Sequence, residues 1–197
     1  MKFTPKGPGR YLSGKLSPDG QTVVATAELA GNSNLYLLDR SGNVIRRLTE
    51  AAGIEVSPSW SPDGKQIVFV SDRSGSPQLY ILDLSDGKTR RLTYNGSYNT
   101  SPEWSPKGDR IVYTGRVGSR FAIFSISVDG GEPRKLTAES ADSEDPTWSP
   151  DGRFIAFASN RAGRYHLYVM QASGENQRRL TGSGGDDTKP SWSPRLD

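Results

Sequence analysis

The sequence offers few residues that could carry out catalysis, and these do not form a catalytic set. A hydrolase needs a nucleophile, a general base and an acid that orients the base, yet the 197-residue chain has no Gly-x-Ser-x-Gly motif, no cysteine and a single histidine, His166. One histidine does not make the imidazole pair typical of a zinc site, and no glycine-rich loop leads into a helix to hold a phosphate. We therefore expect a protein that is not an enzyme and uses no cofactor.

Three aspartates recur in one type of turn, and carboxylates are ligands that a hard cation such as Ca²⁺ prefers. Asp19, Asp63 and Asp151 each follow Ser-Pro and precede Gly, where an aspartate forms the turn by bonding to the backbone ahead of it. Lys107 stands at the same place in another copy, which argues against a ring of metal ligands. An ion held by carbonyls in a central channel is chemically allowed, but its place is unknown from the sequence.

These turns belong to a repeat that runs through the chain. The phrases Leu-Ser-Pro-Asp-Gly, Trp-Ser-Pro-Asp-Gly, Trp-Ser-Pro-Lys-Gly, Trp-Ser-Pro-Asp-Gly and Trp-Ser-Pro-Arg-Leu start at residues 16, 60, 104, 148 and 192, always 44 residues apart. A Leu-Thr pair recurs at the same spacing, at residues 48, 92, 136 and 180. A period of about 40 to 45 residues with strand-like content is typical of β-propeller blades.

Each period contains four short strand-like segments. In the second period they are residues 57–61, 66–71, 79–84 and 89–94. The second and third segments are apolar on both faces, as in a sheet that neighbouring blades cover on both sides, and the recurring Trp is expected to pack between blades. The prediction is an all-β fold, a β-propeller of four-stranded blades.

The predicted propeller is a single domain over residues 1–197. Its repeats lie at about 12–55, 56–99, 100–143 and 144–187, with a partial repeat at 188–197. The inner strand occurs five times, the last near residues 190–193, whereas the other three strands occur four times. Two arrangements stay open: a closed ring with one surplus inner strand, or a homodimer that completes a larger ring by strand exchange.

Recognition of a protein or peptide is the function we expect, and loops on a rigid scaffold are where recognition usually occurs. The loops between the second and third strands, and those between successive repeats, differ from copy to copy and emerge on one face. Aromatic residues and arginines, which anchor protein interfaces, gather there with carboxylates. The predicted partner-binding residues are Arg73, Tyr94, Tyr98, Arg116, Arg120, Phe121, Asp142, Arg161, Arg164, Tyr165, Asp186 and Asp187.

Composition argues against several other functions. The net charge of +3 does not indicate a nucleic-acid binder, and no stretch approaches the roughly 18 to 20 apolar residues of a membrane span. No apolar segment like that of a signal peptide follows Met1.

Two basic residues precede each Leu-Thr pair, in the expected outermost strand. Their charge is expected either to prevent edge-to-edge association of sheets or to contact anionic lipid or polyanions.

The pattern "PSWSPDG.QIVF.S.R.G....LY..D..G...RLT" resembles the blades of the TolB family of periplasmic β-propellers, from about Leu12 to Leu196. The resemblance implies a periplasmic propeller of the Tol-Pal cell-envelope system, with a protein partner such as the peptidoglycan-associated lipoprotein. TolB proteins also have an export signal, an amino-terminal α/β domain and six blades. The sequence is therefore expected to be a fragment, or a short relative without that domain.

Two alternatives stay open beside this resemblance. Similar repeats occur in the gating propellers of prolyl-oligopeptidase and tricorn-like peptidases, so the chain could be such a gating or accessory propeller. It could also be a designed or truncated model propeller with no native ligand.

Overall fold

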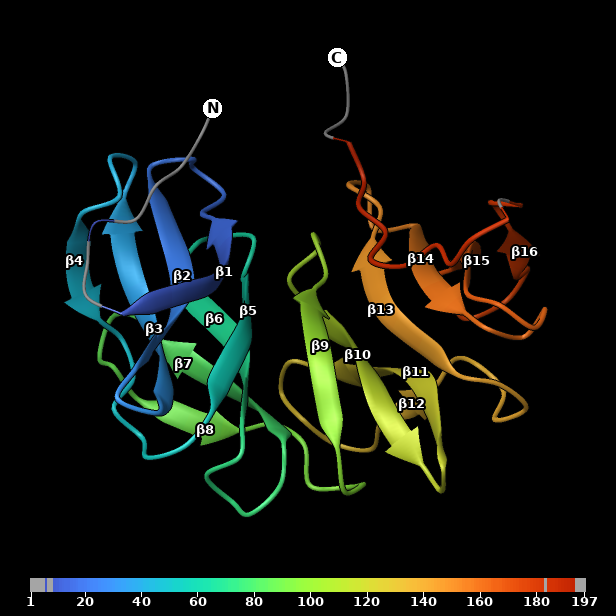
Figure 1. Cartoon of the computed structure of the whole chain (residues 1–197), viewed down its shortest axis with the longest axis horizontal. Helices are drawn as coiled ribbons and strands as arrows, with labels where there is room; N and C mark the ends of the chain where they lie inside the picture. The colour runs from blue at the N-terminus through green and yellow to red at the C-terminus, as the bar shows by residue number, and fades with distance from the viewer. Residues whose placement is uncertain (1–5, 7–8, 183, 194–197) are drawn as a thin grey trace. The chain divides into compact units, whose positions relative to one another are not determined.

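The computed structural model describes residue 6 and residues 9–182 and 184–193 of the chain. These residues form sixteen strands, arranged in four antiparallel sheets of four strands each (Figure 1). Among them, no helix has the length and apolar character needed to cross a membrane. The prediction of an all-β fold made of four-stranded blades is confirmed.

The four sheets belong to two compact units, Met1–Tyr94 and Asn95–Asp197, and each unit is described by itself. We number the sheets blade 1 to blade 4 in chain order. In the first unit, blade 1 contains β1 (Arg10–Leu16), β2 (Thr22–Leu29), β3 (Asn32–Asp39) and β4 (Val44–Arg47), and blade 2 contains β5 (Glu55–Trp60), β6 (Gln66–Ser71), β7 (Gln78–Asp83) and β8 (Thr89–Arg91). In the second unit, blade 3 contains β9 (Asn99–Trp104), β10 (Arg110–Val117), β11 (Arg120–Ser127) and β12 (Arg134–Lys135), and blade 4 contains β13 (Ser143–Trp148), β14 (Phe154–Ser159), β15 (His166–Gln171) and β16 (Arg178–Arg179).

In every sheet the strands lie side by side in chain order, so each sheet is an antiparallel meander. All connections between first and second strands, and between third and fourth strands, therefore lie at one end of a blade, which we call the turn end. The connections between second and third strands lie at the opposite end, together with the segments that lead to the next blade. We call this opposite end the loop end.

The Ser-Pro-Asp-Gly turns are held by their own side chains, as the sequence predicts. Ser61 Oγ donates to Asp63 Oδ1 (2.6 Å), and the Lys65 N–H donates to the same carboxylate oxygen (3.0 Å). The Ser61 hydroxyl in turn accepts the Gln66 N–H (2.9 Å). The first and fourth blades have the same bonds around Asp19 and Asp151. These bonds hold the chain at the point where it reverses between the first two strands.

The first strand of blades 2, 3 and 4 contains a β-bulge. The pairing register shifts within β5, β9 and β13, where Ser57, Ser101 and Asp145 have φ angles of 54°, 48° and 52°. These are left-handed backbone conformations at residues other than glycine, and each precedes a proline. β5 begins at Glu55, two residues before the start that the sequence predicts at residue 57.

A threonine hydroxyl ends each fourth strand and ties it to the third. The Leu79 N–H donates to Thr93 Oγ1 (2.9 Å), and the hydroxyl donates to Gln78 Oε1 (2.8 Å). The N–H groups of Leu35, Ile123 and Leu167 donate in the same way to the threonine 14 residues later. The predicted strand at 89–94 is shorter in the structure and ends at Arg91, and the Thr93 side chain supplies the acceptor for the Leu79 N–H beyond it.

The basic pairs lie in the fourth strands, at the sheet edges, as expected. The second member of three pairs also has a local bond: Arg47 Nε donates to the carbonyl of Thr49 (2.7 Å), and Arg91 Nε donates to that of Thr93 (2.6 Å). Arg179 Nε donates in the same way to the carbonyl of Thr181. These arginines therefore brace the end of the strand in addition to charging its edge.

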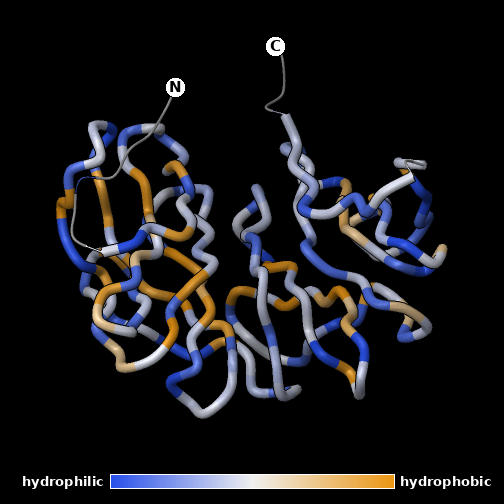
Figure 2. The backbone as a smooth tube through the Cα atoms, in the orientation of Figure 1, coloured by the Kyte–Doolittle hydropathy of each residue, from blue (hydrophilic) through white to orange (hydrophobic). Residues whose placement is uncertain are grey.

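The core of each unit lies between its two blades. In the first unit, β5 packs on β1, β2 and β3, and Trp60 joins a cluster formed by Val24 and Leu35 of blade 1 with Phe69 and Tyr80 of blade 2, among others. Trp60 Nε1 donates to the carbonyl of Lys15 in β1 (2.9 Å). The predicted packing of a Trp between blades is confirmed here, and the hydrophobic residues follow mainly the middle strands (Figure 2).

The second unit repeats this packing but not the indole bond, since Trp148 Nε1 is buried without a hydrogen-bond partner among the described residues. β13 packs on β9, β10 and β11, and Trp148, 6% exposed, lies in a cluster with Val112, Ile123 and Phe157. Here a carboxylate also joins the two blades: Glu103 Oε1 accepts the Thr147 hydroxyl (2.9 Å) and the Trp148 N–H (3.1 Å).

The fifth inner strand expected near residues 190–193 is not formed, because these residues belong to no strand. Trp192 nevertheless donates its Nε1–H to the carbonyl of Thr147 (3.2 Å), 45 residues earlier, as Trp60 does to Lys15. The end of the predicted partial repeat, residues 194–197, lies outside the described residues. The homodimer by strand exchange stays a prediction.

The buried threonine bond leads to a stability prediction. Replacing Thr93 with valine keeps the shape of the side chain but leaves the Leu79 N–H and Gln78 Oε1 without their partner. We expect a loss of about 1–3 kcal/mol in the free energy of unfolding, measured by urea denaturation. The control is Thr89→Val in β8, at a half-buried position, which should change stability by less than about 0.5 kcal/mol. Equal effects of the two variants would contradict the assignment.

A second prediction concerns acid stability. Hydrogen bonds from the Ser85 and Gln66 side chains, and from the Ser85 N–H, lower the pKa of Asp83 to about 2. Because the pKa is lowered in the folded chain, this contribution is present above about pH 4 and is lost as the pH falls toward 2. Asp83→Asn should therefore flatten the fall of the thermal midpoint between pH 4 and pH 2. An unchanged pH profile would show that these bonds do not favour the carboxylate.

Candidate binding surface

The twelve residues predicted to bind a partner are divided between the two units. Arg73 and Tyr94 belong to the first unit, and the other ten belong to the second. The candidate surface is therefore built from the loop end of the second unit, where the connecting segments of blades 3 and 4 meet.

Asp142 is the centre of this loop end. Its Oδ1 accepts the Phe121 N–H (3.0 Å), and its Oδ2 accepts Arg120 Nη1 and Asn160 Nδ2 (3.0 Å each). Its own N–H donates to Asn160 Oδ1 (2.9 Å), and its carbonyl accepts the Ser159 hydroxyl (2.8 Å). One aspartate thus joins the β10–β11 loop, the segment between blades 3 and 4 and the β14–β15 loop.

The electrostatics of Asp142 agree with this role. Burial opposes ionisation, but the bonds from Phe121, Asn160 and Arg120 outweigh it and lower the pKa of the carboxyl group. The Asp142 side chain is 16% exposed and that of Arg120 is 48% exposed. The aspartate is therefore largely buried in the loop end, whereas the arginine is open to contact from solvent.

Two aromatic side chains lie beside this pair. Tyr98 and Phe121 contact each other edge to face, with ring centroids 5.9 Å apart, and Tyr98 is 37% exposed. The carbonyl of Tyr98 accepts the Arg116 N–H (2.9 Å), and Arg116 Nε donates to the carbonyl of Gly118 (3.1 Å). The structure therefore brings Tyr98, Arg116, Arg120, Phe121 and Asp142 together, as predicted.

Blade 4 repeats the aspartate contact one period later. The Tyr165 N–H donates to Asp186 Oδ1 (3.0 Å), as the Phe121 N–H does to Asp142. The Tyr165 hydroxyl donates to Glu144 Oε1, and burial, followed by this contact, raises the pKa of Tyr165. Arg164 Nη1 donates to the carbonyl of Gly184. These residues form a second ordered group, in which Tyr165 is half-buried.

Asp187 and His166 form a buried polar contact beside this group. Asp187 Oδ2 accepts the Thr181 hydroxyl (2.6 Å) and lies 3.3 Å from His166 Nδ1. His166 is 5% exposed and is the first residue of β15. The histidine thus contributes to the end of a strand.

Two of the predicted partner-binding arginines are engaged in the fold. Arg73 pairs with the fully buried Glu55 and lies over the ring of Tyr80, 4.9 Å from its centroid. Arg161 stands two periods later and lies over the ring of Tyr168, 4.6 Å from its centroid. Arg161 also donates to the Ser159 hydroxyl (3.1 Å) and to Gln177 Oε1 (2.7 Å).

A buried carboxylate needs its counterion, because an unpaired charge in the interior is strongly unfavourable. We therefore assign Arg73 a positioning role at the edge of the loop end. Arg161 is held in the equivalent stacked position by its bonds to Ser159 and Gln177. The remaining predicted residue, Tyr94, is 72% exposed. The guanidinium carbon of Arg91 lies over its ring, 4.8 Å from the ring centroid.

Sequence reasoning missed two residues that organise the loop ends: Asn160 and Glu55. They lie at strand ends, and the residues at the same positions of other repeats are of different types, so no periodic signal marks them. The recurring Phe-x-Ser-x-Arg at residues 69–73 and 157–161 could have identified the two stacked arginines as structural, because it persists where the loops otherwise diverge.

The described residues contain no group of three or more His, Cys, Asp or Glu side chains arranged to hold a metal ion. In the part of the chain covered by the structure, the aspartates of the Ser-Pro-Asp-Gly turns bond to serine hydroxyls and backbone N–H groups instead.

Comparison with known proteins gives consistent results. The family model described as the TolB beta propeller domain matches residues 3–196. The solved structure of TolB from Acinetobacter baumannii superimposes with a TM-score of 0.80 at 33% identity, over 89% of this chain and 44% of that one. That of a putative TolB from Agrobacterium tumefaciens gives 0.78 at 27% identity, over 84% of this chain and 63% of that one. This chain thus spans less than two thirds of either structure. None of the curated proteins compared with it matches.

The Asp142 network can be tested by stability measurements. Asp142→Ala leaves the Phe121 N–H and the Arg120 guanidinium without their acceptor, so we expect a loss of about 1–3 kcal/mol. Hydrogen exchange should accelerate at residues 118–121 and 158–161. A matched control is Asp129→Ala in the turn between β11 and β12, for which exchange at these loops should not change. Normal protection in the Asp142 variant would contradict the network.

Proposed function

We propose that this chain, which belongs to the TolB beta propeller domain family, is a non-catalytic scaffold that binds a protein or peptide. The observation that carries the proposal is the loop end of the second unit. There Asp142 fixes three connecting segments in one arrangement, beside the exposed ring of Tyr98 and the guanidinium groups of Arg116 and Arg120.

This surface has the properties of a recognition site. Tyrosine and arginine supply much of the binding energy at protein interfaces, because they offer a large apolar contact together with directed hydrogen bonds. Side chains already held in place lose little conformational entropy on binding, which favours affinity. The adjoining carboxylate of Asp142 gives the surface both signs of charge, and complementary charge favours one partner over others.

The resemblance to TolB proteins supplies the partner and compartment that we propose. The partner is the peptidoglycan-associated lipoprotein of the Tol-Pal system, and the compartment is the bacterial periplasm. Because the chain spans less than two thirds of the TolB structures it resembles, both are proposals for this chain. The part of the surface used would be the aromatic and basic group around Tyr98.

The test is calorimetric titration of the chain with the lipid-free periplasmic domain of the lipoprotein. We expect saturable binding that Tyr98→Ala weakens by about tenfold or more, and Arg116→Gln by a smaller factor. Lys88→Gln is the matched control: it removes the same charge from an exposed side chain at the turn end of blade 2, and should leave the affinity unchanged.

Two outcomes would contradict parts of this proposal. An absence of binding by a chain that circular dichroism shows to be folded would exclude this lipoprotein as the partner. Binding that neither Tyr98→Ala nor Arg116→Gln weakens would exclude the loop end of the second unit as the surface.

A further inference from the structure

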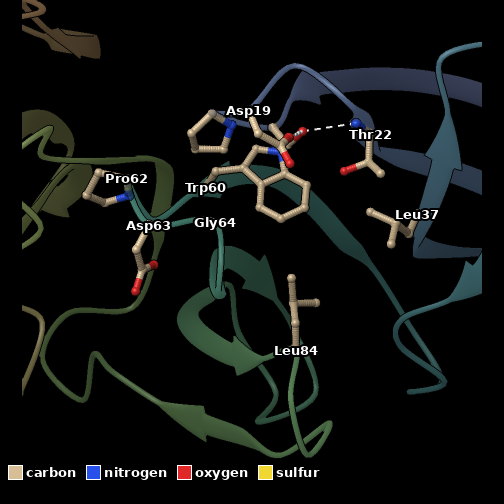
Figure 3. A pocket seen from close by; sticks show the side chains of 10 residues that line it. Asp19, Thr22, Leu37, Trp60, Pro62, Asp63, Gly64 and Leu84 are labelled. Carbon is tan, nitrogen blue, oxygen red and sulfur yellow. Dashed lines mark hydrogen bonds between the residues drawn. The ribbon is translucent and has the colours of Figure 1, made fainter.

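A pocket opens at the turn end of the first unit, away from its loops. It lies where the first turn of blade 1 meets the first turn of blade 2, and has a volume of about 490 Å³ (Figure 3). Leu37 of β3 and Leu84, which follows β7, complete its lining. This pocket takes no part in the proposed function.

The indole ring of Trp60 forms the centre of the pocket. Figure 3 shows the ring between the turn of Asp19 and the chain at Gly64, with Leu37 and Leu84 at its sides. The ring is half-buried, and the bond from its Nε1–H to the carbonyl of Lys15 fixes its orientation. A fixed aromatic face that stays partly exposed can bind an apolar group, or a cation placed over the ring.

The charged residues that line the pocket are both acidic. Hydrogen bonds from Ser17 and Ser61, respectively, lower the pKa values of Asp19 and Asp63, so both are ionised at neutral pH. Among the described residues, no lysine or arginine belongs to the lining. Asp19 lies beside the Trp60 ring, whereas the Asp63 carboxylate points away from it (Figure 3). Asp19 is therefore placed to meet a bound cation, and Asp63 adds negative charge at the rim.

The second unit has the same junction, and there cationic side chains of the protein occupy it. Lys107 and Arg110 stand where blade 1 has Asp19 and Thr22, two periods earlier. Arg110 Nε donates to the Ser125 hydroxyl (2.7 Å), and Ser125 stands where the first unit has Leu37. The Lys107 stem lies across the turn, its Cε 3.3 Å from the place that a Cβ on Gly152 would take.

Exposure of the two tryptophans differs accordingly. Trp148, at the junction with Lys107 and Arg110, is 6% exposed, whereas Trp60 is only partly buried. The same framework therefore holds basic side chains in one unit and presents an aromatic face with a carboxylate in the other.

We propose that the pocket around Trp60 binds an organic cation, an ammonium or guanidinium group on an apolar stem. The stem would lie on Trp60, Leu37 and Leu84, and the cation would meet Asp19. A lysine or arginine side chain of a peptide has this chemistry, and so does a small free alkylamine. The site is independent of the loop end of the second unit, so failure of one proposal leaves the other standing.

The test is an NMR titration of the ¹⁵N-labelled chain, followed at the Trp60 indole N–H, which Trp60→Phe identifies. The probes are Nα-acetyl-lysine methylamide, the arginine equivalent, n-butylammonium and the neutral norleucine equivalent. We expect the lysine and arginine probes to shift the signal saturably, and norleucine to bind at least about threefold more weakly. Butylammonium distinguishes the sources: equal affinity indicates a free amine, and weaker affinity a peptide side chain.

The variants test the acidic contact. Asp19→Asn keeps the oxygen that accepts the turn bonds and removes the charge, so it should weaken lysine binding by about threefold. Asp19→Lys places a lysine where the second unit has Lys107, and should abolish binding. Asp63→Asn should have a smaller effect than Asp19→Asn. The matched control, Asp86→Asn, removes a carboxylate that does not line the pocket and should have no effect.

Circular dichroism and the thermal midpoint show whether each variant is folded. If the Asp19 variants prove unfolded, the comparison of charged and neutral probes on the unaltered chain still decides the matter. The proposal is overturned if norleucine binds as tightly as lysine, or if no cationic probe shifts the signal. Unchanged affinity in a folded Asp19→Lys variant would overturn it as well.

Discussion

The packing of one tryptophan between successive blades is the interaction on which each unit depends. A four-stranded meander of short strands buries too little apolar surface to be stable alone. In the first unit Trp60 closes the gap between blades 1 and 2, and in the second Trp148 closes the gap between blades 3 and 4. The first strand of the later blade also packs on three strands of the earlier one, which adds to the contact made by the tryptophan.

Much of this arrangement could be predicted, because its determinants are local or periodic. Pro, Asp and Gly specify a turn within a few residues, and the constant spacing of Trp-Ser-Pro and Leu-Thr identifies the blades without reference to contacts. The residues at which strands begin and end were harder to predict from the sequence. The fourth strand of blade 2 stops at Arg91, and beyond it the Leu79 N–H donates to the Thr93 hydroxyl and not to a backbone carbonyl. Residues 190–193 match the sequence pattern of a first strand, but they form no strand in the structure. A strand forms only where a neighbouring strand pairs with it.

The candidate surface was predicted in composition but not in organisation. Aromatic and basic residues do gather at the loop end of the second unit, yet their arrangement depends on bonds between segments about 20 residues apart, such as Phe121 to Asp142. A single sequence does not contain that information. The arginines show the same limit: Arg73 and Arg116 both stand near the loop end of a blade, but the first pairs with a buried glutamate and the second is exposed.

The hydrogen bond from a tryptophan to the preceding repeat also bears on how such chains lengthen in evolution. Trp60 and Trp192 bond to carbonyls 45 residues earlier, so each contact joins one copy of the 44-residue segment to the copy before it. Duplication of that segment therefore creates both halves of a new contact at once, since the new tryptophan meets a surface like the one its parent already fits. An array of this kind can gain a blade without compensating substitutions, and the copies can then diverge at their loops and turns.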